Sequence, residues 1–309
     1  MSLITRLSIH LNRLLLARAE KGPYRILLKN LEKTPFINLA SKVLSTEYFK
    51  DQLQPLALPV NRFKDILVIA PHQDDETIGC GGTLLLTKNH CENLHIVYIT
   101  DGGLINFPGG IEESIKVRYL EAEKVCEELS ATMHRMDISN HVPEPKKEHL
   151  EELAKIIQEV KPQVVFVPWL LDFPPKHRLS NHILLKTDQL FDLPDFEIWG
   201  YQVHNMLIPN GYVDITSVIK DKSKLLDYYS SQNNLYADHS HMTQGMNAWN
   251  SRFLPDHKAN GNPKFAEIFF TLPKNEYLRL VKKFYLPSLT DTYGSDLKVL
   301  QAVQQMISI

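Results

Sequence analysis

One stretch of the chain, Asp65–Leu86, constrains the fold more than any other. It opens with the apolar run Ile66–Ala70, which ends at Pro71. A short, unbroken run of this kind is typical of a strand that is buried on both faces of a parallel sheet. Four ionisable residues follow within five positions: His72, Asp74, Asp75 and Glu76. Reacting groups of open α/β sheets gather at the carboxyl ends of strands, and an imidazole beside a carboxylate suits a divalent metal ion.

The acidic cluster has a second interpretation. Asp and Glu also stand at helix N-termini, where they cap backbone N–H groups and complement the helix dipole. We expect the glycines that follow, Gly79, Gly81 and Gly82, to form a turn, with a helix beginning near Thr83. Residue types alone leave the metal site and the helix cap equally open.

Strands and helices alternate after this stretch. Leu94–Thr100 and Gln163–Trp169 read as strands, and residues 112–129 and 148–160 read as amphipathic helices. The alternation predicts an α/β fold, Rossmann-like, with a mainly parallel sheet flanked by helices and right-handed crossovers. The residues expected on the buried side of the helix at 112–129 are Leu120, Val125, Cys126 and Leu129.

The first 62 residues differ from the rest. Apolar residues recur there at helical spacing, with basic residues among them, and we expect an extra helical N-terminal arm over 1–62 before a domain at 63–309. Such an arm lies on a membrane surface, packs on the domain or packs on a second subunit, as in a homo-oligomer. The sequence leaves these outcomes open.

Composition narrows the class of protein. The 309 residues suffice for a large core, and a formal net charge of −2 gives no field that would attract nucleic acid. The three cysteines, Cys80, Cys91 and Cys126, contain no CxxC pair, which favours reduced thiols in a cytoplasmic protein. We find no apolar run of transmembrane length and no signal peptide pattern.

The string P-H-Q-D-D-E-T-I-G-C-G-G-T at 71–83 resembles the P-H-P-D-D-E…G-C-G-G-T signature of the PIG-L/LmbE family of metal-dependent N-acetyl-sugar deacetylases. One position differs, since Gln73 stands where the family usually has Pro. The resemblance implies that His72 and Asp75 bind the metal and that Asp74 is the general base. It implies for Glu76 a role in orienting neighbouring ligands or in capping a helix.

A second motif follows the strand Gln163–Trp169. The segment from Asp172 to Asn181 resembles the family's D-x-H-P-D-H-R segment and places His177 at the third metal-binding position. The implied cofactor is Zn²⁺, although Fe²⁺, Co²⁺ or Mn²⁺ suits such a site because affinity alone does not select the ion. His182 is a rival ligand that falls within the next apolar helix, and motif position favours His177.

The second motif also departs from the family. Pro174 stands where the family has a His that is thought to stabilise the tetrahedral intermediate or to protonate the leaving amine, and Lys176 stands where it has an Asp that orients this His. Loss of one such donor costs on the order of a hundredfold or more in turnover. Lys176 could supply positive charge instead, and His182 or His204 could enter from nearby elements.

The resemblance extends from Asp65 to about Phe270. Arg118 and Glu121 resemble the family's R-x-x-E, which implies that Arg118 binds the sugar or an attached phosphate. The alternative is a solvated helix-face ion pair with Glu121 or a neighbour. Tyr201–Thr216 resembles a segment of family members that work in surface-glycan biosynthesis, with His204 in place of a Trp. Further on, Trp249 and Arg252 are candidates to contact a sugar face.

The sequence therefore predicts a zinc-dependent N-deacetylase, a hydrolase that removes the acetyl group from an N-acetylglucosamine-type unit of a glycan precursor or glycoconjugate. The alternative is a catalytically impaired homologue that binds metal or carbohydrate, which Pro174 and Lys176 keep open. A dinucleotide-dependent oxidoreductase is disfavoured because no G-x-G-x-x-G opens the first helix.

Overall fold

The structure is a computed structural model that describes residues 54–309 apart from 233–237, 256–261, 294–295 and 308. The chain divides into two units, Met1–Leu56 and Ala57–Ile309. The helices expected within the first 53 residues lie outside the described residues, and the boundary after residue 62 stays a prediction. In the part that the structure describes, no helix is long and apolar enough to cross a membrane.

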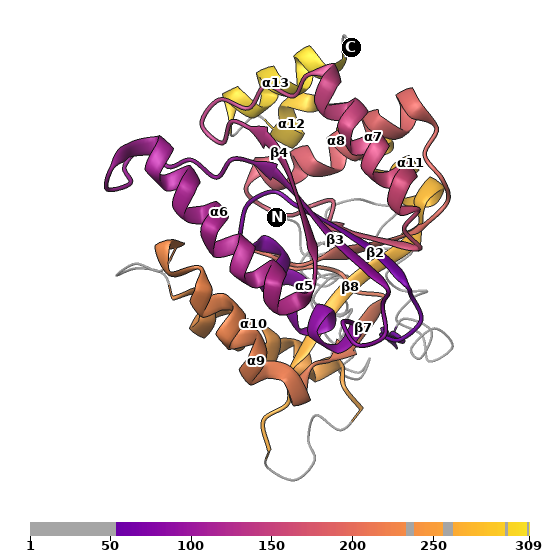
Figure 1. The fold of residues 1–309 in the computed structure, drawn as a ribbon. Helices are drawn as coiled ribbons and strands as arrows, with labels where there is room; N and C mark the ends of the chain where they lie inside the picture. The colour runs from indigo at the N-terminus through magenta and orange to yellow at the C-terminus, as the bar shows by residue number, and fades with distance from the viewer. Residues whose placement is uncertain (1–53, 233–237, 256–261, 294–295, 308) are drawn as a thin grey trace, which may run out of the picture. The chain divides into compact units, whose positions relative to one another are not determined.

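The described strands form one mixed sheet of eight, in the order β1-β7-β8-β6-β5-β2-β3-β4 (Figure 1). Its strands are β1 (Leu56–Ala57), β2 (Asp65–Ala70), β3 (Asn93–Thr100), β4 (Thr132–Ile138), β5 (Val164–Pro168), β6 (Glu197–Tyr201), β7 (Gly211–Asp214) and β8 (Ala266–Pro273). Strands β4, β3, β2, β5 and β6 pair in parallel, and β8 adds antiparallel pairings to β6 and β7. The predicted α/β fold with a mainly parallel sheet is confirmed, with an antiparallel extension at one side.

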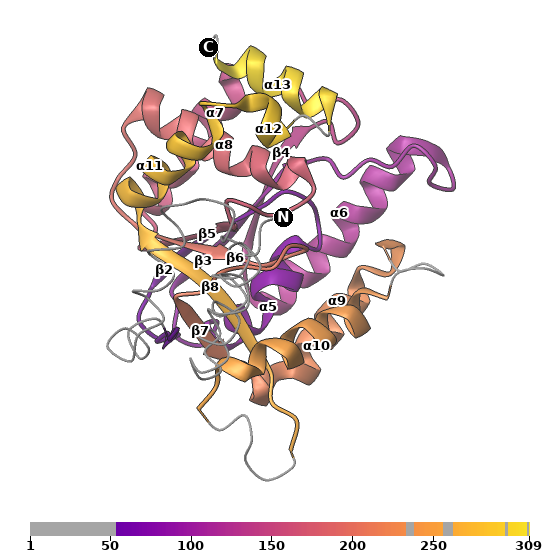
Figure 2. The same cartoon turned by 180° about the vertical axis from the view of Figure 1, so that it is seen from behind.

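Helices cover both faces of the sheet, as the two opposite views show (Figures 1 and 2). One face carries α5 (Asp75–Thr87), α6 (Gly110–Leu129), α9 (Ile219–Tyr228) and α10 (His239–Asn250). The other carries α7 (Lys147–Val160), α8 (Pro175–Phe191), α11 (Lys274–Tyr285), α12 (Leu289–Tyr293) and α13 (Leu297–Ile307).

The strand β2 supplies side chains to two separate hydrophobic clusters. Ile66, Val68 and Ala70 pack in the cluster that includes residues of α5 and α6, whereas Leu67 and Ile69 pack in the cluster that includes residues of α7 and α8. Successive side chains of a strand point to opposite faces, so a strand between two helical layers must be apolar throughout. This double burial is the reason for the unbroken apolar run.

The direction in which successive strands are added to the sheet reverses beside β2. The chain first runs outward from β2 to β3 and β4, and then returns to the other side of β2 through β5 and β6. Connections that leave two neighbouring strands in opposite directions open a gap at their carboxyl ends, where ligands of open α/β sheets bind. The two sequence motifs follow β2 and β5, so both motifs lie at these carboxyl ends.

The glycine-rich segment is not a turn, which corrects the prediction. Gly79, Gly81 and Gly82 all lie within α5, which already begins at Asp75. A Cβ atom on Gly79 would lie 2.1 Å from Cδ2 of Tyr201, and one on Gly82 would lie 2.8 Å from Cγ2 of Ile215. The glycines therefore let α5 approach its neighbours closely, although glycine is a poor helix former.

One side chain of α6 was also placed wrongly by the helical pattern. Leu120 is 48% exposed, whereas Val125, Cys126 and Leu129 are buried as expected. Leu120 lies between Tyr119 and Glu121, which both face inward. The buried stripe of α6 includes the polar residues Arg118 and Glu121, which a search for apolar periodicity does not count.

Candidate metal centre

His72 and Asp75 meet directly after β2. The Asp75 carboxylate accepts a hydrogen bond from the backbone N–H of His72 at 3.0 Å through Oδ2, and the same oxygen lies 3.0 Å from Nδ1 of the His72 ring. Asp75 is the first residue of α5, so its side chain stands at the helix N-terminus and turns back toward the end of the strand. The two residues thus form one local unit three positions apart.

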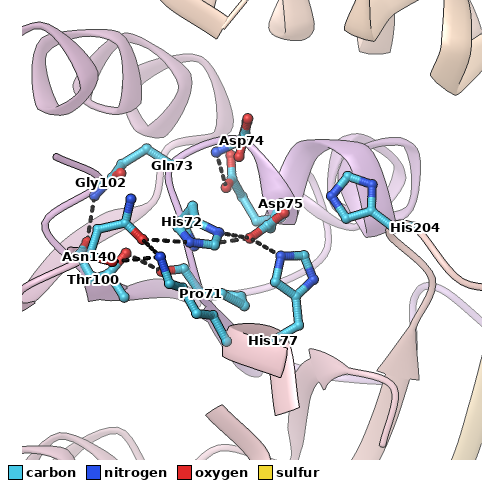
Figure 3. A network of polar contacts seen from close by, with 12 residues as sticks. Pro71, His72, Gln73, Asp74, Asp75, Thr100, Gly102, Asn140, His177 and His204 are labelled. Carbon is cyan, nitrogen blue, oxygen red and sulfur yellow. Dashed lines mark hydrogen bonds and ion pairs between the residues drawn. The ribbon is translucent and has the colours of Figure 1, made fainter. Parts of the chain in front are cut away.

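His177 comes to this unit from the other motif. It is the third residue of α8, it is buried, and its Nε2 lies 3.5 Å from Oδ2 of Asp75. One ligand atom each from His72, Asp75 and His177 lies within 4.8 Å of the others (Figure 3). Residues that are 102 positions apart in the sequence therefore converge at the carboxyl ends of β2 and β5.

Each of the two imidazoles also contacts a buried polar side chain through its other ring nitrogen. Nδ1 of His177 lies 2.8 Å from Oδ2 of Asp172, and Nε2 of His72 lies 3.2 Å from Oδ1 of Asn140. The ring nitrogens that remain, Nδ1 of His72 and Nε2 of His177, both face Asp75. Partners of this kind fix the orientation and tautomer of a metal-binding histidine.

Sequence reasoning missed Asn140, which follows β4. Lys176 donates hydrogen bonds from Nζ to the Asn140 backbone oxygen at 2.5 Å and to Oδ1 at 2.9 Å. Burial lowers the pKa of Lys176. The Lys176 ammonium group therefore binds Asn140, and it is linked to His72 through the Asn140 side-chain amide. Asn140 belongs to neither sequence motif. It reaches the site because β4 lies beside β3 in the sheet.

Burial and neighbouring charges act against each other on the pKa values of the three residues. Burial raises the pKa of Asp75, but the charge of His177 and the hydrogen bond from His72 outweigh burial, and the pKa lies below its ordinary value. Burial lowers the pKa of His72, which favours the neutral ring that a metal ion requires. Burial also opposes charge on His177, but Asp75 and Asp172 raise its pKa. The His177 ring thus lies between two carboxylates, those of Asp75 and Asp172.

Asp74 does not cap α5. It stands at the N-cap position with φ 142° and ψ −29°, and its side chain makes no capping hydrogen bond. Its carboxylate instead lies 3.4 Å from Nη2 of Arg118 and 3.5 Å from Nδ1 of His239. A non-glycine residue at such a φ is strained by about 1–3 kcal/mol. The surrounding contacts hold Asp74 in this strained conformation, next to Asp75.

Arg118 makes no ion pair with Glu121. The buried guanidinium donates to the backbone oxygens of Gln73 at 2.8 Å and Gly102 at 3.2 Å. Glu121 accepts hydrogen bonds from Ser230 and Ser231 instead. The solvated helix-face pair is therefore wrong, and Arg118 fastens the loops after β2 and β3.

Glu76 lies away from the ligand atoms. Its buried carboxylate accepts hydrogen bonds from Thr77 at 2.6 Å and Tyr229 at 2.5 Å, and from the backbone N–H of Asp74 at 3.2 Å. Burial raises its pKa to about 7. By accepting the hydrogen bond from the Asp74 backbone, Glu76 supports the strained conformation of that residue.

The other candidate histidines occupy different places. His182 lies in the core, where Nδ1 is 3.4 Å from the hydroxyl of Tyr293, and burial lowers its pKa to about 4. The ring of His204 lies beside His177, with 5.2 Å between the two centroids. Trp249 is exposed and lies 4.8 Å beneath the Arg252 guanidinium. A sugar contact of that pair stays a prediction.

The segment that contains both motifs is similar to a known protein family. Residues 67–187 match the family model of PIG-L, described as GlcNAc-PI de-N-acetylase. This segment of the chain is therefore similar to the PIG-L domain. The matched range runs from β2 to α8 and contains both motifs.

The relatives share the fold and differ in chemistry. A diacetylchitobiose deacetylase of Thermococcus kodakarensis is 27% identical over 192 residues, which is 56% of this chain and 72% of the relative. The N,N'-diacetylchitobiose deacetylase of Pyrococcus horikoshii superposes with a TM-score of 0.61 at 22% identity, over 78% of this chain and 93% of that one. A 4-carboxy-2-hydroxymuconate hydratase of Pseudomonas putida KT2440 superposes with a TM-score of 0.59 at 20% identity, over 68% and 96%. The fold alone therefore does not fix the reaction.

Proposed function

We propose that this protein is a metal-dependent hydrolase that removes the acetyl group from an N-acetylglucosamine-type unit of a glycan precursor or glycoconjugate. The observation that carries the proposal is the convergence of His72, Asp75 and His177, with the Asp74 carboxylate beside them. The PIG-L match and the deacetylase relative support this reaction over the hydration that the Pseudomonas putida neighbour performs.

Three atoms would hold the ion: Nδ1 of His72, Oδ2 of Asp75 and Nε2 of His177. A His-Asp-His set suits Zn²⁺ with coordination positions left for water and substrate, and it also suits Fe²⁺, Co²⁺ or Mn²⁺. Such an ion lowers the pKa of a bound water to about 7 and polarises an amide carbonyl.

Side chains around the ion would transfer the proton and orient the ligands. Asp74 would accept the proton of the attacking water, while Arg118 and His239 hold its carboxylate in place. Asp172 and Asn140 would keep the two ligand rings oriented. Direct binding of the sugar by Arg118 stays a prediction, because the contacts of its guanidinium are with Gln73, Gly102 and Asp74.

A second function rests on one observation. Lys176, at a position where the family has an acidic residue, donates to Asn140 and supplies no carboxylate to the site. This change favours a homologue that binds metal or carbohydrate without turnover.

Glycan biosynthesis, a cytoplasmic location and the roles of the N-terminal arm stay predictions from the sequence.

The decisive experiment is acetate release from a panel of N-acetylhexosamines and their short oligosaccharides by the zinc-loaded protein. Asp74→Asn is the matched control, since it keeps the size of the side chain and removes the base. Release by the wild type that vanishes in Asp74→Asn supports the deacetylase. A protein that binds one zinc ion and releases acetate from no substrate supports the binding function.

A further inference from the structure

Hydrolysis of an amide needs a donor for the oxygen that gains negative charge in the transition state, and such donors are worth about a hundredfold to a thousandfold in kcat. The side chains of the metal centre do not offer one to the substrate. Ring nitrogens of His72 and His177 are directed at Asp75 or held by Asn140 and Asp172. The ammonium of Lys176 is committed to Asn140.

His204 lies beside the metal centre. It stands in the loop after β6, and its ring is tilted by 31° against the ring of His177, with 5.2 Å between centroids. His72 lies at a similar distance, 5.3 Å, and on the other side of His177 (Figure 3). His204 is exposed, whereas His177 and Asp75 are buried. It therefore borders the cluster on a side that solvent, and hence a substrate, can reach.

The loop that carries His204 is fixed to the metal centre. Oδ1 of Asp172 accepts hydrogen bonds from the backbone N–H groups of His204 at 3.1 Å and Asn205 at 2.8 Å, while Oδ2 of the same carboxylate holds His177. Asn205 also donates to the Leu171 oxygen at 2.9 Å. One buried carboxylate thus sets the positions of both His177 and the His204 backbone.

The two rival histidines are less suited to this role. His239 lies against Asp74, at 3.5 Å, so its ring acts on the proposed base. His182 lies in the core with Tyr293. His204 is set apart from them by its ring contact with His177.

We propose that His204 is a catalytic residue of the deacetylation, and this inference rests on the proposed function. A ring N–H of His204 donates a hydrogen bond to the acetamide oxygen of the substrate, and the bond strengthens as that oxygen becomes negative. The role requires no proton transfer, because a neutral imidazole always carries one N–H. A bond that strengthens in the transition state raises kcat more than it lowers KM.

The test compares His204→Leu, which has no donor, with His204→Gln, which keeps one. His90→Leu is the matched control, since His90 is exposed and precedes the amino end of β3, whereas the metal centre lies at the carboxyl ends of the strands. We expect His204→Leu to lose about a hundredfold to a thousandfold in kcat with little change in KM. His204→Gln should retain more activity, and added imidazole should partly restore His204→Leu. All variants should bind one zinc ion per chain and unfold at the wild-type temperature.

Each other outcome overturns the inference in a recognisable way. Wild-type kcat in His204→Leu removes His204 from the reaction and leaves the deacetylase standing. Loss of zinc from His204→Leu makes His204 part of the metal site, and a rise in KM alone makes it a binding residue. Absence of acetate from the wild type with every substrate overturns the proposed function, and the inference falls with it.

Discussion

Oδ2 of Asp172 lies 2.8 Å from Nδ1 of His177, and this contact turns Nε2 of the same ring toward Asp75. Asp172 follows β5 and is completely buried. The carboxylate makes the Nδ1–H tautomer the favoured one, which leaves the lone pair of Nε2 for a metal ion. The orientation of one proposed ligand therefore depends on a residue that would not touch the ion.

Asp172→Asn should weaken metal binding. An amide can present its own N–H to Nδ1 and so favour the wrong tautomer, and loss of such a partner typically costs about 10–100-fold in metal affinity. Zinc affinity measured by competition with a chelator checks this. Asp195→Asn is the control, because Asp195 is exposed and precedes the amino end of β6, away from the metal centre. Equal affinity in the wild type and both variants would show that Asp172 does not position His177.

Gly79→Ala should destabilise the fold. The new Cβ would lie 2.1 Å from the buried ring of Tyr201, whose hydroxyl is fixed by a hydrogen bond to the Ile69 oxygen at 2.9 Å. Overpacking of about 1–3 kcal/mol should exceed the gain of about 1 kcal/mol in helix propensity. In contrast, Gly245→Ala in α10 meets no atom within 4 Å and should stabilise the protein by about 0.5–1 kcal/mol. Urea unfolding of both variants measures the difference, and an equal gain in both would contradict the close contact.

Lys222→Met should be one of the most damaging substitutions outside the metal centre. Nζ of Lys222 is buried and lies 2.6 Å from Oε1 of Glu267, whose carboxylate also accepts hydrogen bonds from Gly82 and Thr83 of α5. Removal of one member leaves a buried charge without its partner, which costs about 3–5 kcal/mol. Lys224→Met is the control, because Lys224 lies on the same helix but is exposed.

The same unfolding measurement tests this pair. The control should unfold like the wild type, because exposed ion pairs contribute little. A Lys222→Met protein as stable as the Lys224→Met protein would show that the buried ion pair does not hold α5 against β8.

His182 should make the protein sensitive to acid. Burial, with a smaller contribution from Lys186, lowers its pKa from 6.5 to about 4. The unfolded chain therefore binds a proton on this residue at a higher pH than the folded chain does. The contribution to stability is complete above pH 6.5 and is lost as the pH falls from 6.5 toward 4.

His182→Gln, which cannot be protonated, should remove this part of the pH dependence. The free energy of unfolding measured from pH 7 to pH 4 should fall less steeply for His182→Gln than for the wild type. His90→Gln, at an exposed position, should follow the wild-type curve. Parallel curves for all three proteins would contradict the buried, neutral state of His182.

The sequence predicted those parts of the fold that have a local signal. Ile66–Ala70 and Val164–Pro168 are fully buried strands, and each is an apolar run because helices cover both of its faces. The strand β4 was missed because several of its side chains are exposed or half-buried and it forms no apolar run. The glycines of α5 were predicted to form a turn. They are needed for close contact with Tyr201 and Ile215, which lie more than a hundred positions away in the sequence, so no local pattern indicates their role.

The candidate site likewise contains residues that a sequence motif indicates and residues that only the structure brings in. His72 and Asp75 lie three positions apart, and the resemblance of the second motif brought in His177, so the structure's convergent set was already proposed from sequence. Asn140 and His239 could not be predicted, because only the sheet order and the packing of α10 bring them near His72 and Asp74. His204 was named only as a residue that could enter from a nearby element, and its contact with His177 needed the structure.

We propose that His72, Asp75 and His177 hold an ion that this chain uses to hydrolyse an acetamide. A stepwise addition of zinc to the metal-free protein, with acetate release from an N-acetylhexosamine followed at each step, is the sharpest test. We expect no release without metal, a linear rise that breaks at one zinc per chain, and no such rise for His177→Ala. Release of acetate by the metal-free protein, or an unchanged titration for His177→Ala, would contradict it.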